Sequence, residues 1–318
     1  MPGITGMVTS YDCPNFVGEL FGISREDTPF LSAIGGLTGG ENTGSTIFTW
    51  QSYDLRAGQD DRQRAEGADA PGAEGRKRVP GSNVLEIHQE QVAVSYTKQG
   101  ATRQISGSDP MQSGNQPVTD ELTWQISQEI KQIARDVNKS FLTGTYHLPA
   151  DIDDGVRRTR GILQAVTTNV VTNATPADLT SEMVLDVMQL AFENGGLRET
   201  ETRTIITGAK QKRKLTKAFI SDKGYKEETR NVGGVNLQVI ETDFGRCNIM
   251  LEPDMPDDQL AFVSLEECAP RFLEIPGKGH FFLESLAKTG ASDKAQLYGE
   301  IGLKYGNQRK HAKLTGLK

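Results

Sequence analysis

The chain has 318 residues, of which 36% are hydrophobic, 24% are charged and 7% are aromatic. This length and composition are typical of a globular protein with a sizeable core in one to three domains, and they exclude a chain that is disordered throughout. The 35 basic residues against 42 acidic ones give a formal net charge of −7, which disfavours tight DNA binding by the whole surface. No stretch approaches the ~18 apolar residues of a membrane span, and the N-terminus lacks a basic segment followed by an apolar one. We therefore expect no membrane partner and no export signal.

Residues 1–45 are rich in turn-forming residues and predict an extended N-terminal arm. The stretch REDTPFLSAI within this arm predicts one short helix, with Thr28 as its N-cap and Pro29 at its first position. The stretch GGENTGST at the end of the arm lacks the lysine of a phosphate-binding loop, so we interpret it as a flexible joint.

Two strands are predicted at residues 46–55 and 84–97, on either side of an unusually polar stretch. Residues 56–83 contain Val79 as their only large apolar side chain, together with six basic and five acidic residues. These charged residues are Arg56, Asp60, Asp61, Arg62, Arg64, Glu66, Asp69, Glu74, Arg76, Lys77 and Arg78. The pattern predicts a long hairpin with a charged tip.

The tip has too few apolar side chains to build a core of its own. Ordering its 28 residues costs about 30–50 kcal/mol at roughly 1–2 kcal/mol per residue, and its own protomer does not supply that compensation. Two interpretations stand equal from the loop alone. The tip is either a disordered loop, or it becomes ordered by lying across a neighbouring subunit, where rows of opposite charges fix register and partner choice.

The strongest predicted element is a helix over residues 120–143, which would be ~36 Å long. Thr119 is its predicted N-cap and Gly144 its predicted end. Its apolar residues recur at spacings of 4, 4, 3, 4 and 4 and form a single stripe: Leu122, Ile126, Ile130, Ile133, Val137 and Phe141. A helix of this length is expected to act as a spine.

The second half of the chain mixes strands and helices without a regular βαβ alternation. We predict a strand-like segment at residues 162–172 and an amphipathic helix at residues 176–194 that opens with Thr175 and Pro176. A buried strand RTIITGA, a basic helix KQKRKLTKAFI and three strands, VNLQVIET, RCNIMLE and QLAFVSL, follow. The alternating stretch KAQLYGEIGLKYG predicts a last strand. The fold class is therefore α+β, in two lobes.

No pattern indicates an enzyme, a cofactor or a metal. The stretch DIDDG, residues 151–155, has Ile162 where a calcium loop needs an acidic residue, so we interpret it as a solvated acidic turn. The four histidines are scattered and no GxSxG nucleophile motif occurs. The three cysteines are far apart and are expected to be reduced thiols.

One basic cluster stands out at residues 210–217. It consists of Lys210, Lys212, Arg213, Lys214 and Lys217. We interpret it as a solvated helix face with Leu215 and Phe219 turned inward, while contact with nucleic acid or with an acidic partner surface is the alternative. No aromatic residues alternate with these lysines, which disfavours stacking on single strands.

The order of arm, polar-tipped hairpin, spine helix and second mixed lobe resembles the major capsid proteins of tailed bacteriophages, with the Hong Kong 97 type fold. The stretches that carry the likeness are DTPFLSAIG, FTWQSYDL, AEGADA, the helix from Asp120 and TRGILQAVTTN. The resemblance implies an N-terminal arm at 1–45, an extended β-hairpin loop at 46–100, a peripheral domain with the spine helix at 101–175, an axial domain at 176–286 and a C-terminal return to the peripheral domain at 287–318.

The resemblance also implies a function. Such a protein self-assembles into hexamers and pentamers of an icosahedral phage head that encloses double-stranded DNA, after assembly in the host bacterial cytoplasm. Its partners would be itself, the portal, scaffolding or decoration proteins, and packaged DNA through weak non-specific contacts. It would catalyse no reaction, and its location would be the virion.

In such shells the hairpin lies over the adjacent subunit, which favours an intersubunit role for the tip. The residues expected to make that contact are Arg62, Arg64, Glu66, Asp69, Glu74, Arg76, Lys77 and Arg78. Three alternatives stay open: an encapsulin-like nanocompartment shell protein, an enzyme with a flexible polar lid, and a monomeric DNA-binding accessory protein that uses residues 210–217.

Overall fold

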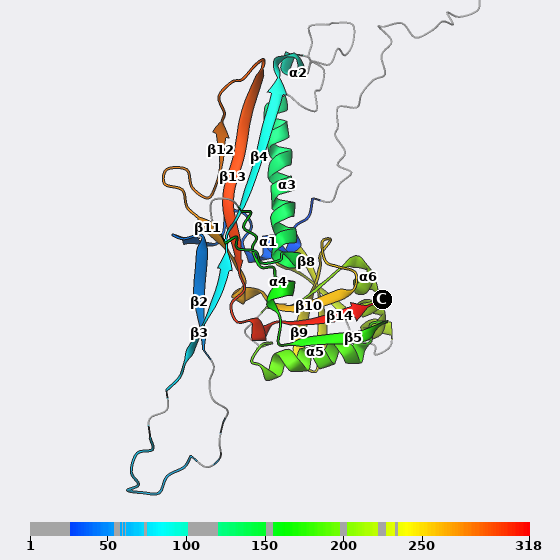
Figure 1. Cartoon of the computed structure of the whole chain (residues 1–318). Coiled ribbons are helices and arrows are strands. Elements are labelled where there is room, and N and C mark those ends of the chain that lie inside the picture. Colours follow the sequence, from blue (N-terminus) through cyan, green and yellow to red (C-terminus); the bar gives the residue numbers. More distant parts are fainter. Residues whose placement is uncertain are drawn as a thin grey trace, which may run out of the picture. The chain divides into compact units, whose positions relative to one another are not determined.

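The computed structural model describes residues 26–53, 58, 60, 62–72, 75–100, 120–150, 155–197, 202–221, 227–232 and 235–318 (Figure 1). The chain forms two compact units, each built from segments that are distant in the sequence. Among the described residues, the first unit contains 26, 90–100, 120–132 and 283–297, and the second unit contains the remainder. Helices and strands alternate irregularly, which confirms the predicted α+β class.

The second unit contains a seven-stranded mixed sheet with the strand order β5-β14-β10-β6-β9-β8-β7. Its strands are β5 (Val170–Ala177), β6 (Arg203–Thr207), β7 (Glu227–Val232), β8 (Val235–Thr242), β9 (Gly245–Leu251), β10 (Gln259–Ser264) and β14 (Ala312–Leu317). The β5–β14 and β6–β9 pairs are parallel and the other pairs are antiparallel. All residues of the central strand β6 are buried, which confirms the buried strand predicted there.

Alternate residues along the strands of this sheet are buried on its two opposite faces. Ile205 of β6 and Phe262 of β10 face each other across the ladder and pack in one cluster with α5 (Ser181–Glu193) and α6 (Ala209–Thr216). Their chain neighbours, such as Ile206, are buried on the other face of the sheet. Helices α5 and α6 therefore cover the same face, and the inward positions of Leu215 and Phe219 are confirmed.

Helix α5 begins at Ser181, five residues later than predicted. Thr180 is its N-cap, and its hydroxyl accepts a hydrogen bond from Met183 N at 3.3 Å. Thr175 and Pro176 instead lie in β5, which is an edge strand paired with β14. Proline is tolerated at a sheet edge because the amide it lacks would face away from the ladder. The local helix signal was overridden by a strand partner about 140 residues away in the chain.

Helix α3 (Glu121–Thr143) confirms the predicted spine helix. Asp120 caps it, with Leu122 N donating to Asp120 Oδ1 at 3.0 Å, while the predicted cap Thr119 lies outside the described residues. The C-terminal part of the predicted stripe, from Ile133 onward, is buried. Gly144 ends the helix where a Cβ would lie 2.3 Å from Ser140 O and 2.7 Å from Thr159 O, so only glycine fits there.

A second sheet has the strand order β1-β11-β13-β12, and β4 also pairs with β13. Its strands are β1 (Glu41–Thr43), β4 (Glu86–Ser95), β11 (Ala269–Leu273), β12 (Phe281–Ser285) and β13 (Ser292–Lys304). The expected flexible joint is wrong, because β1 lies within GGENTGST and pairs in parallel with β11. Gly40 permits this pairing, since a Cβ there would lie 2.4 Å from Pro270 O.

The other helical elements are short. They are α1 (Pro29–Ile34), α2 (Tyr96–Gly100), α4 (Ile162–Ala165), η1 (Lys217–Ser221), η2 (Leu265–Glu267) and η3 (Gln308–Lys310). Pro29 opens α1 as predicted, although the Thr28 side chain makes no capping hydrogen bond. The segment predicted as strand-like from residue 162 begins as the helical turn α4 and becomes β5 from Val170. None of the described helices is both long and apolar enough to span a lipid bilayer.

Candidate assembly interface

The hairpin is formed by β2 (Ile47–Tyr53) and β3 (Arg78–Val84), whose antiparallel register runs from Ile47 opposite Val84 to Tyr53 opposite Arg78. The sequence prediction is wrong in one respect, because it paired the first strand with residues 84–97. Those residues largely form β4, which pairs with β13, and the partner of β2 lies inside the polar stretch. Pro80 and Gly81 read as a turn locally, but here they complete the ladder opposite Gln51 and Trp50.

Gly81 is required by the side chain opposite it. A Cβ at Gly81 would lie 2.5 Å from Trp50 Nε1, so the indole ring occupies the space that any other residue would fill. The same Trp50 Nε1 donates to Gly306 O at 2.7 Å, and the ring packs edge-on against Tyr305 with centroids 4.8 Å apart. The aromatic side chain thus attaches the hairpin to the segment that follows β13.

Asn83 holds the base of the hairpin with every hydrogen-bonding group of its amide. It is fully buried, and its Nδ2 donates to Leu303 O at 2.7 Å and to Arg160 O at 3.1 Å. Its Oδ1 accepts from Arg160 N at 2.8 Å and from Val84 N at 2.9 Å. A buried amide with all partners in place fixes one geometry, because any displacement leaves polar groups unpaired.

Buried charged groups lie next to this base. Glu86 Oε2 accepts from Thr159 N at 3.1 Å, and its Oε1 lies 2.9 Å from His88 Nε2. Arg157 forms an ion pair with Glu300 at 2.9 Å, and both side chains are at least 90% buried. Segment 157–160, which carries the Arg160 partner of Asn83, is therefore itself held by carboxylates of β4 and β13.

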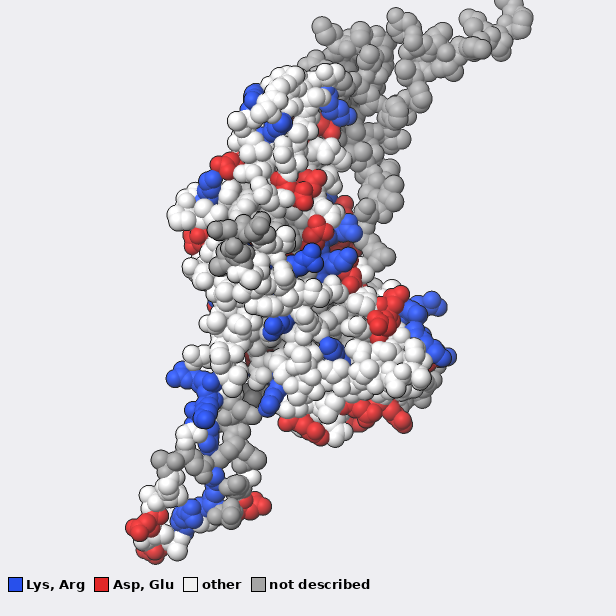
Figure 2. All heavy atoms as spheres, viewed as in Figure 1, with Lys and Arg blue, Asp and Glu red and all other residues white. Residues whose placement is uncertain are grey.

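The tip has the opposite character. All described residues from 63 to 72 and from 75 to 80 are exposed, including Arg64, Glu66 and Asp69. Figure 2 shows basic and acidic side chains together at this end of the hairpin. Arg62 is half-buried, and Glu74 lies outside the described residues. Closer to the strands, Arg76, Lys77 and Arg78 are exposed, and Arg78 Nη1 donates to Gln51 Oε1 at 2.8 Å. Their role in contacts between subunits stays a prediction.

Comparison with known proteins decides the family. A sequence model described as SU10 major capsid protein matches residues 3–318. The chain is a member of the SU10 major capsid protein family. It is 31% identical over 130 residues to the major capsid protein of Escherichia phage Phieco32, an alignment that covers 41% of this chain and 32% of that protein. The chain thus matches about a third of the length of this curated relative.

Solved structures show that this SU10 family member has the Hong Kong 97 type fold. The capsid protein in the cyanophage A-1(L) capsid asymmetric unit matches with a TM-score of 0.66 at 12% identity over 99% of each chain. The SrpI encapsulin of Synechococcus elongatus PCC 7942 matches with a TM-score of 0.58 at 9% identity over 88% of this chain and 85% of that one. The fold expected from the order of the elements is confirmed.

The histidines, the acidic turn and the cysteines were the other candidate sites of the SU10 family member, and those that the structure describes are buried parts of the fold or form no metal site. His311 is buried, with Nε2 at 2.8 Å from Tyr305 O and Nδ1 at 3.3 Å from Ser264 N. Residues 151–154 of the acidic turn lie outside the described residues. Within the described part of the chain, no three His, Cys, Asp or Glu side chains gather as a metal site would require. Cys247 and Cys268 are buried, and burial raises the pKa of both thiols.

The carboxyl group of Glu252 in the SU10 family member has a strongly raised pKa, and its hydrogen bonds connect parts of the protomer. Glu252 follows β9 and is fully buried. Its Oε2 accepts from Phe30 N of α1 at 3.1 Å, and its Oε1 accepts from Asn138 Nδ2 of α3 at 2.8 Å. Asn138 Oδ1 in turn accepts from Leu31 N at 3.0 Å. Burial raises the pKa of Glu252 to about 7.

Sequence reasoning found the charged tip but missed the residues that anchor the hairpin. The tip is visible in composition alone. Trp50, Gly81 and Asn83 acquire their roles from Gly306, Arg160 and Leu303, which only the folded topology brings near. The one available signal was the TRG stretch at residues 159–161, which carried part of the family resemblance.

Proposed function

We propose that this protein is a phage major capsid protein that self-assembles into hexamers and pentamers of an icosahedral head enclosing double-stranded DNA. The observation that carries the proposal is the match of the SU10 major capsid protein family over residues 3–318. The structural likeness to the cyanophage A-1(L) capsid protein over 99% of both chains supports it. The protein would work as a structural component of the virion, with no catalytic role, after assembly in the host cytoplasm.

The hairpin would act as the clasp between subunits. Its base is fixed on its own protomer by the Trp50 and Asn83 contacts, while its charged tip is exposed. Because the base is already rigid in the free protomer, binding of the tip to a neighbouring subunit would cost little free energy for ordering the base. The alternating Arg and Asp/Glu side chains of the tip would then fix register on the adjacent copy more than they add affinity.

Several modest contacts would hold the shell together. A subunit held by its arm, its hairpin tip and its domain edges gains from multivalency even when each contact is weak, and weak contacts let misplaced subunits leave. The net charge of −7 would limit adhesion to packaged DNA, so the contact with DNA would be weak and non-specific. A portal and scaffolding or decoration proteins would be the other partners in a phage head.

An encapsulin-like nanocompartment is the second candidate, favoured by the likeness to the SrpI encapsulin. The two functions differ in cargo. Particles of a phage head would hold double-stranded DNA after packaging, whereas a nanocompartment would hold protein. Nuclease-resistant DNA in particles from infected cells supports the head, and a co-purified protein cargo without DNA supports the nanocompartment.

Replacing the tip tests the clasp. Residues 58–76 are exchanged for a short Gly-Ser linker, which keeps β2, β3 and the Trp50–Gly81 contact. We expect a soluble protomer with wild-type thermal unfolding that forms no closed shells by negative-stain electron microscopy. A matched variant keeps the loop length but exchanges the charged tip residues for Gln and Asn, and we expect few shells from it. Normal shells from the linker variant would refute the clasp.

A further inference from the structure

Helices α5 and α6 form one layer on the seven-stranded sheet, and each turns a row of side chains outward. Both pack their apolar residues into the same core cluster, Val184 and Met188 from α5 and Leu215 from α6. Because they share a face of the sheet, their outer sides belong to one surface of the molecule.

The outer row of α5 is acidic. Its exposed residues Glu182, Asp186, Gln189 and Glu193 recur at spacings of 4, 3 and 4, so they form a single stripe about 16 Å long. The helix contains no Lys or Arg. At its C-terminal end, Phe192 is 56% exposed, and the centroid of its ring lies 5.9 Å from that of Phe244. We call the four-residue stripe the acidic stripe.

The outer row of α6 and the following turn η1 is basic. Lys210, Arg213 and Lys217 are exposed at spacings of 3 and 4 and form a stripe about 10 Å long, which we call the basic stripe. Residues 209–221 contain no Asp or Glu. Figure 2 shows acidic side chains gathered where Figure 1 draws α5 and basic side chains at the edge where it draws α6.

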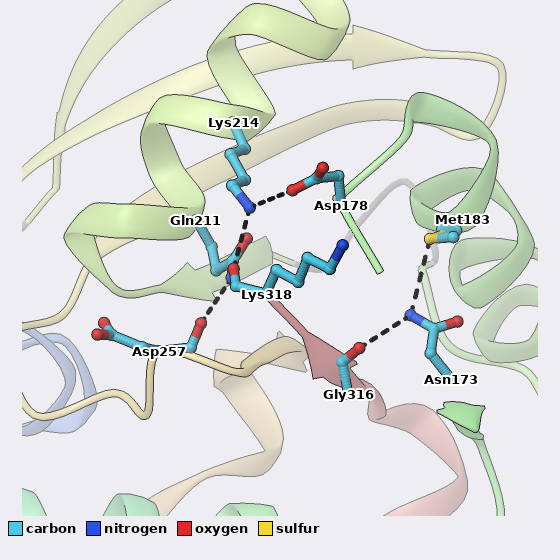
Figure 3. A network of polar contacts seen from close by, with 8 residues as sticks. All are labelled: Asn173, Asp178, Met183, Gln211, Lys214, Asp257, Gly316 and Lys318. Carbon is cyan, nitrogen blue, oxygen red and sulfur yellow. Dashed lines mark hydrogen bonds and ion pairs between the residues drawn. The ribbon is translucent and has the colours of Figure 1, made fainter. Parts of the chain in front are cut away.

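Lys214 is excluded from the basic stripe because it is engaged within the protomer. Its Nζ lies 2.6 Å from Asp178 Oδ1 and donates to Lys318 O at 3.0 Å (Figure 3). Gln211 on the same helix donates from Nε2 to Asp257 O at 2.6 Å and to Lys318 O at 2.8 Å. These contacts hold α6 against the end of β14 and orient its outer row away from the sheet.

We propose that the acidic stripe of one copy of this chain contacts the basic stripe of the next copy in a ring of subunits. The inference deepens the proposed function, since it names a contact within the hexamers and pentamers. The two stripes are opposite in charge and have similar helical spacings, and the basic stripe at about 10 Å fits within the length of the acidic stripe at about 16 Å. Two stripes of the same charge would repel each other. Contact between different surfaces of identical subunits is heterologous, and such contacts form a ring when the rotation from one subunit to the next closes.

A second copy fits this surface better than nucleic acid does. A duplex that reached the basic stripe along this layer would also meet the acidic stripe, whose carboxylates repel phosphate. In a ring, one neighbouring copy would satisfy the acidic stripe and the other neighbouring copy would satisfy the basic stripe. The exposed Phe192 adds an aromatic contact beside the acidic stripe, of the kind that dominates protein interfaces.

Charge reversal and its rescue test the proposal. One variant carries Glu182→Lys and Asp186→Lys, a second carries Lys210→Glu and Arg213→Glu, and a third combines all four. We expect each reversed pair to raise the critical concentration for shell assembly about tenfold or more, corresponding to a loss of about 1.4 kcal/mol or more per subunit. The four-fold variant restores complementary signs and should return to within about twofold of wild type. Circular dichroism melts check that every variant is folded.

A matched control separates contact from net charge. The four-fold variant also regains the wild-type net charge, so a control joins Glu182→Lys and Asp186→Lys with Lys98→Glu and Lys139→Glu, which are exposed and lie outside both stripes. This control has the same net charge and should remain defective. Equal rescue by the control would overturn the proposal, and so would wild-type assembly by the reversed pairs.

Mixing the two reversed pairs tests the ring itself. Each reversed copy carries two stripes of the same net sign, because two reversed charges outnumber the remaining Glu193 or Lys217, so the two kinds of copy should alternate around a ring. Alternation closes in six-membered rings and fails in five-membered ones, so the mixture should form hexamers while icosahedral shells, which need pentamers, stay depleted. Two-fold dimers without rings would overturn the proposal. If the variant with Lys210→Glu and Arg213→Glu assembled as wild type does but its shells no longer retained DNA, the basic stripe would be assigned to DNA binding instead. A wild-type chain that forms no shells would refute the proposed function itself.

Discussion

The two ends of the β2–β3 hairpin are stabilised in opposite ways. At the base, Asn83 is fully buried and its amide makes four hydrogen bonds to the protomer. At the tip, Arg64, Glu66 and Asp69 are exposed to solvent. The base therefore contributes to folding and determines where the tip is held, while the tip contributes little to folding and is available to a partner. Mutations at the two ends should accordingly change different measurements.

The largest loss of stability is expected at the base. Asn83→Ala leaves two carbonyl groups and two amides without their partner, and unpaired buried polar groups cost about 1–3 kcal/mol each without strict additivity. We expect the free energy of unfolding to fall by about 3–5 kcal/mol in urea denaturation of the protomer. The adjacent exposed residue supplies the control, and Ser82→Ala should stay within about 0.5 kcal/mol of wild type. If Asn83→Ala left the free energy of unfolding unchanged, the base of the hairpin would not differ from its tip in its contribution to folding.

How much of this fold the sequence predicts depends on whether an element is specified locally. The spine helix α3 and the strand β6 are predictable because the helical periodicity of the one and the β-branched run of the other lie within the element itself. Strand β3 was missed because Arg78–Val84 contains Pro80 and Gly81 and becomes a strand only beside β2. Helix α5 was predicted too early because Thr175 and Pro176 satisfy a helix-start rule that the β14 pairing overrides.

The same distinction holds for the candidate site. The charged tip is predictable, because a stretch without apolar residues cannot pack wherever it lies. Its anchors are not predictable from one sequence, since Trp50 needs Gly306 and Asn83 needs Leu303, each more than 200 residues away. The acidic and basic stripes are only partly predictable from the sequence. Each is visible as a helical pattern, but their position on one face of a sheet required the topology.

A second buried polar anchor should make stability depend on pH. Glu252 joins α1 to α3, and its burial raises the pKa from 4.5 to about 7, with the nearby Asp254 adding to the rise. Between these two values the folded protein binds the proton more tightly than the unfolded chain. The contribution of this carboxyl to the free energy of unfolding is therefore full below pH 4.5 and lost as the pH rises to 7.

The measurement compares wild type with Glu252→Gln from pH 5 to pH 8. The free energy of unfolding of wild type, relative to that of the variant, should decrease by roughly 2–3 kcal/mol over this range. Asn138→Ala serves as a control, since it removes a hydrogen bond to Glu252 but leaves the titrating carboxyl in place. It should lower stability and keep a pH dependence. An identical pH dependence in wild type and Glu252→Gln would show that this carboxyl does not set it.

The smallest change in folding stability is expected at the tip, where the change in assembly should nevertheless be clear. Arg76→Glu with Lys77→Glu alters exposed side chains, so the free energy of unfolding of the protomer should stay within about 0.5 kcal/mol of wild type. Assembly should be weakened because the reversed charges meet like charges on the neighbour. At high salt the wild-type contacts are already screened. The defect in light scattering of assembling protein should therefore be larger at about 0.05 M salt than at about 0.5 M, where the Debye lengths are roughly 14 Å and 4 Å. Lys77→Arg, which keeps the charge, should assemble as wild type does. A defect of equal size at both salt concentrations would point to misfolding, and the tip would then belong with the base as part of the folded protomer.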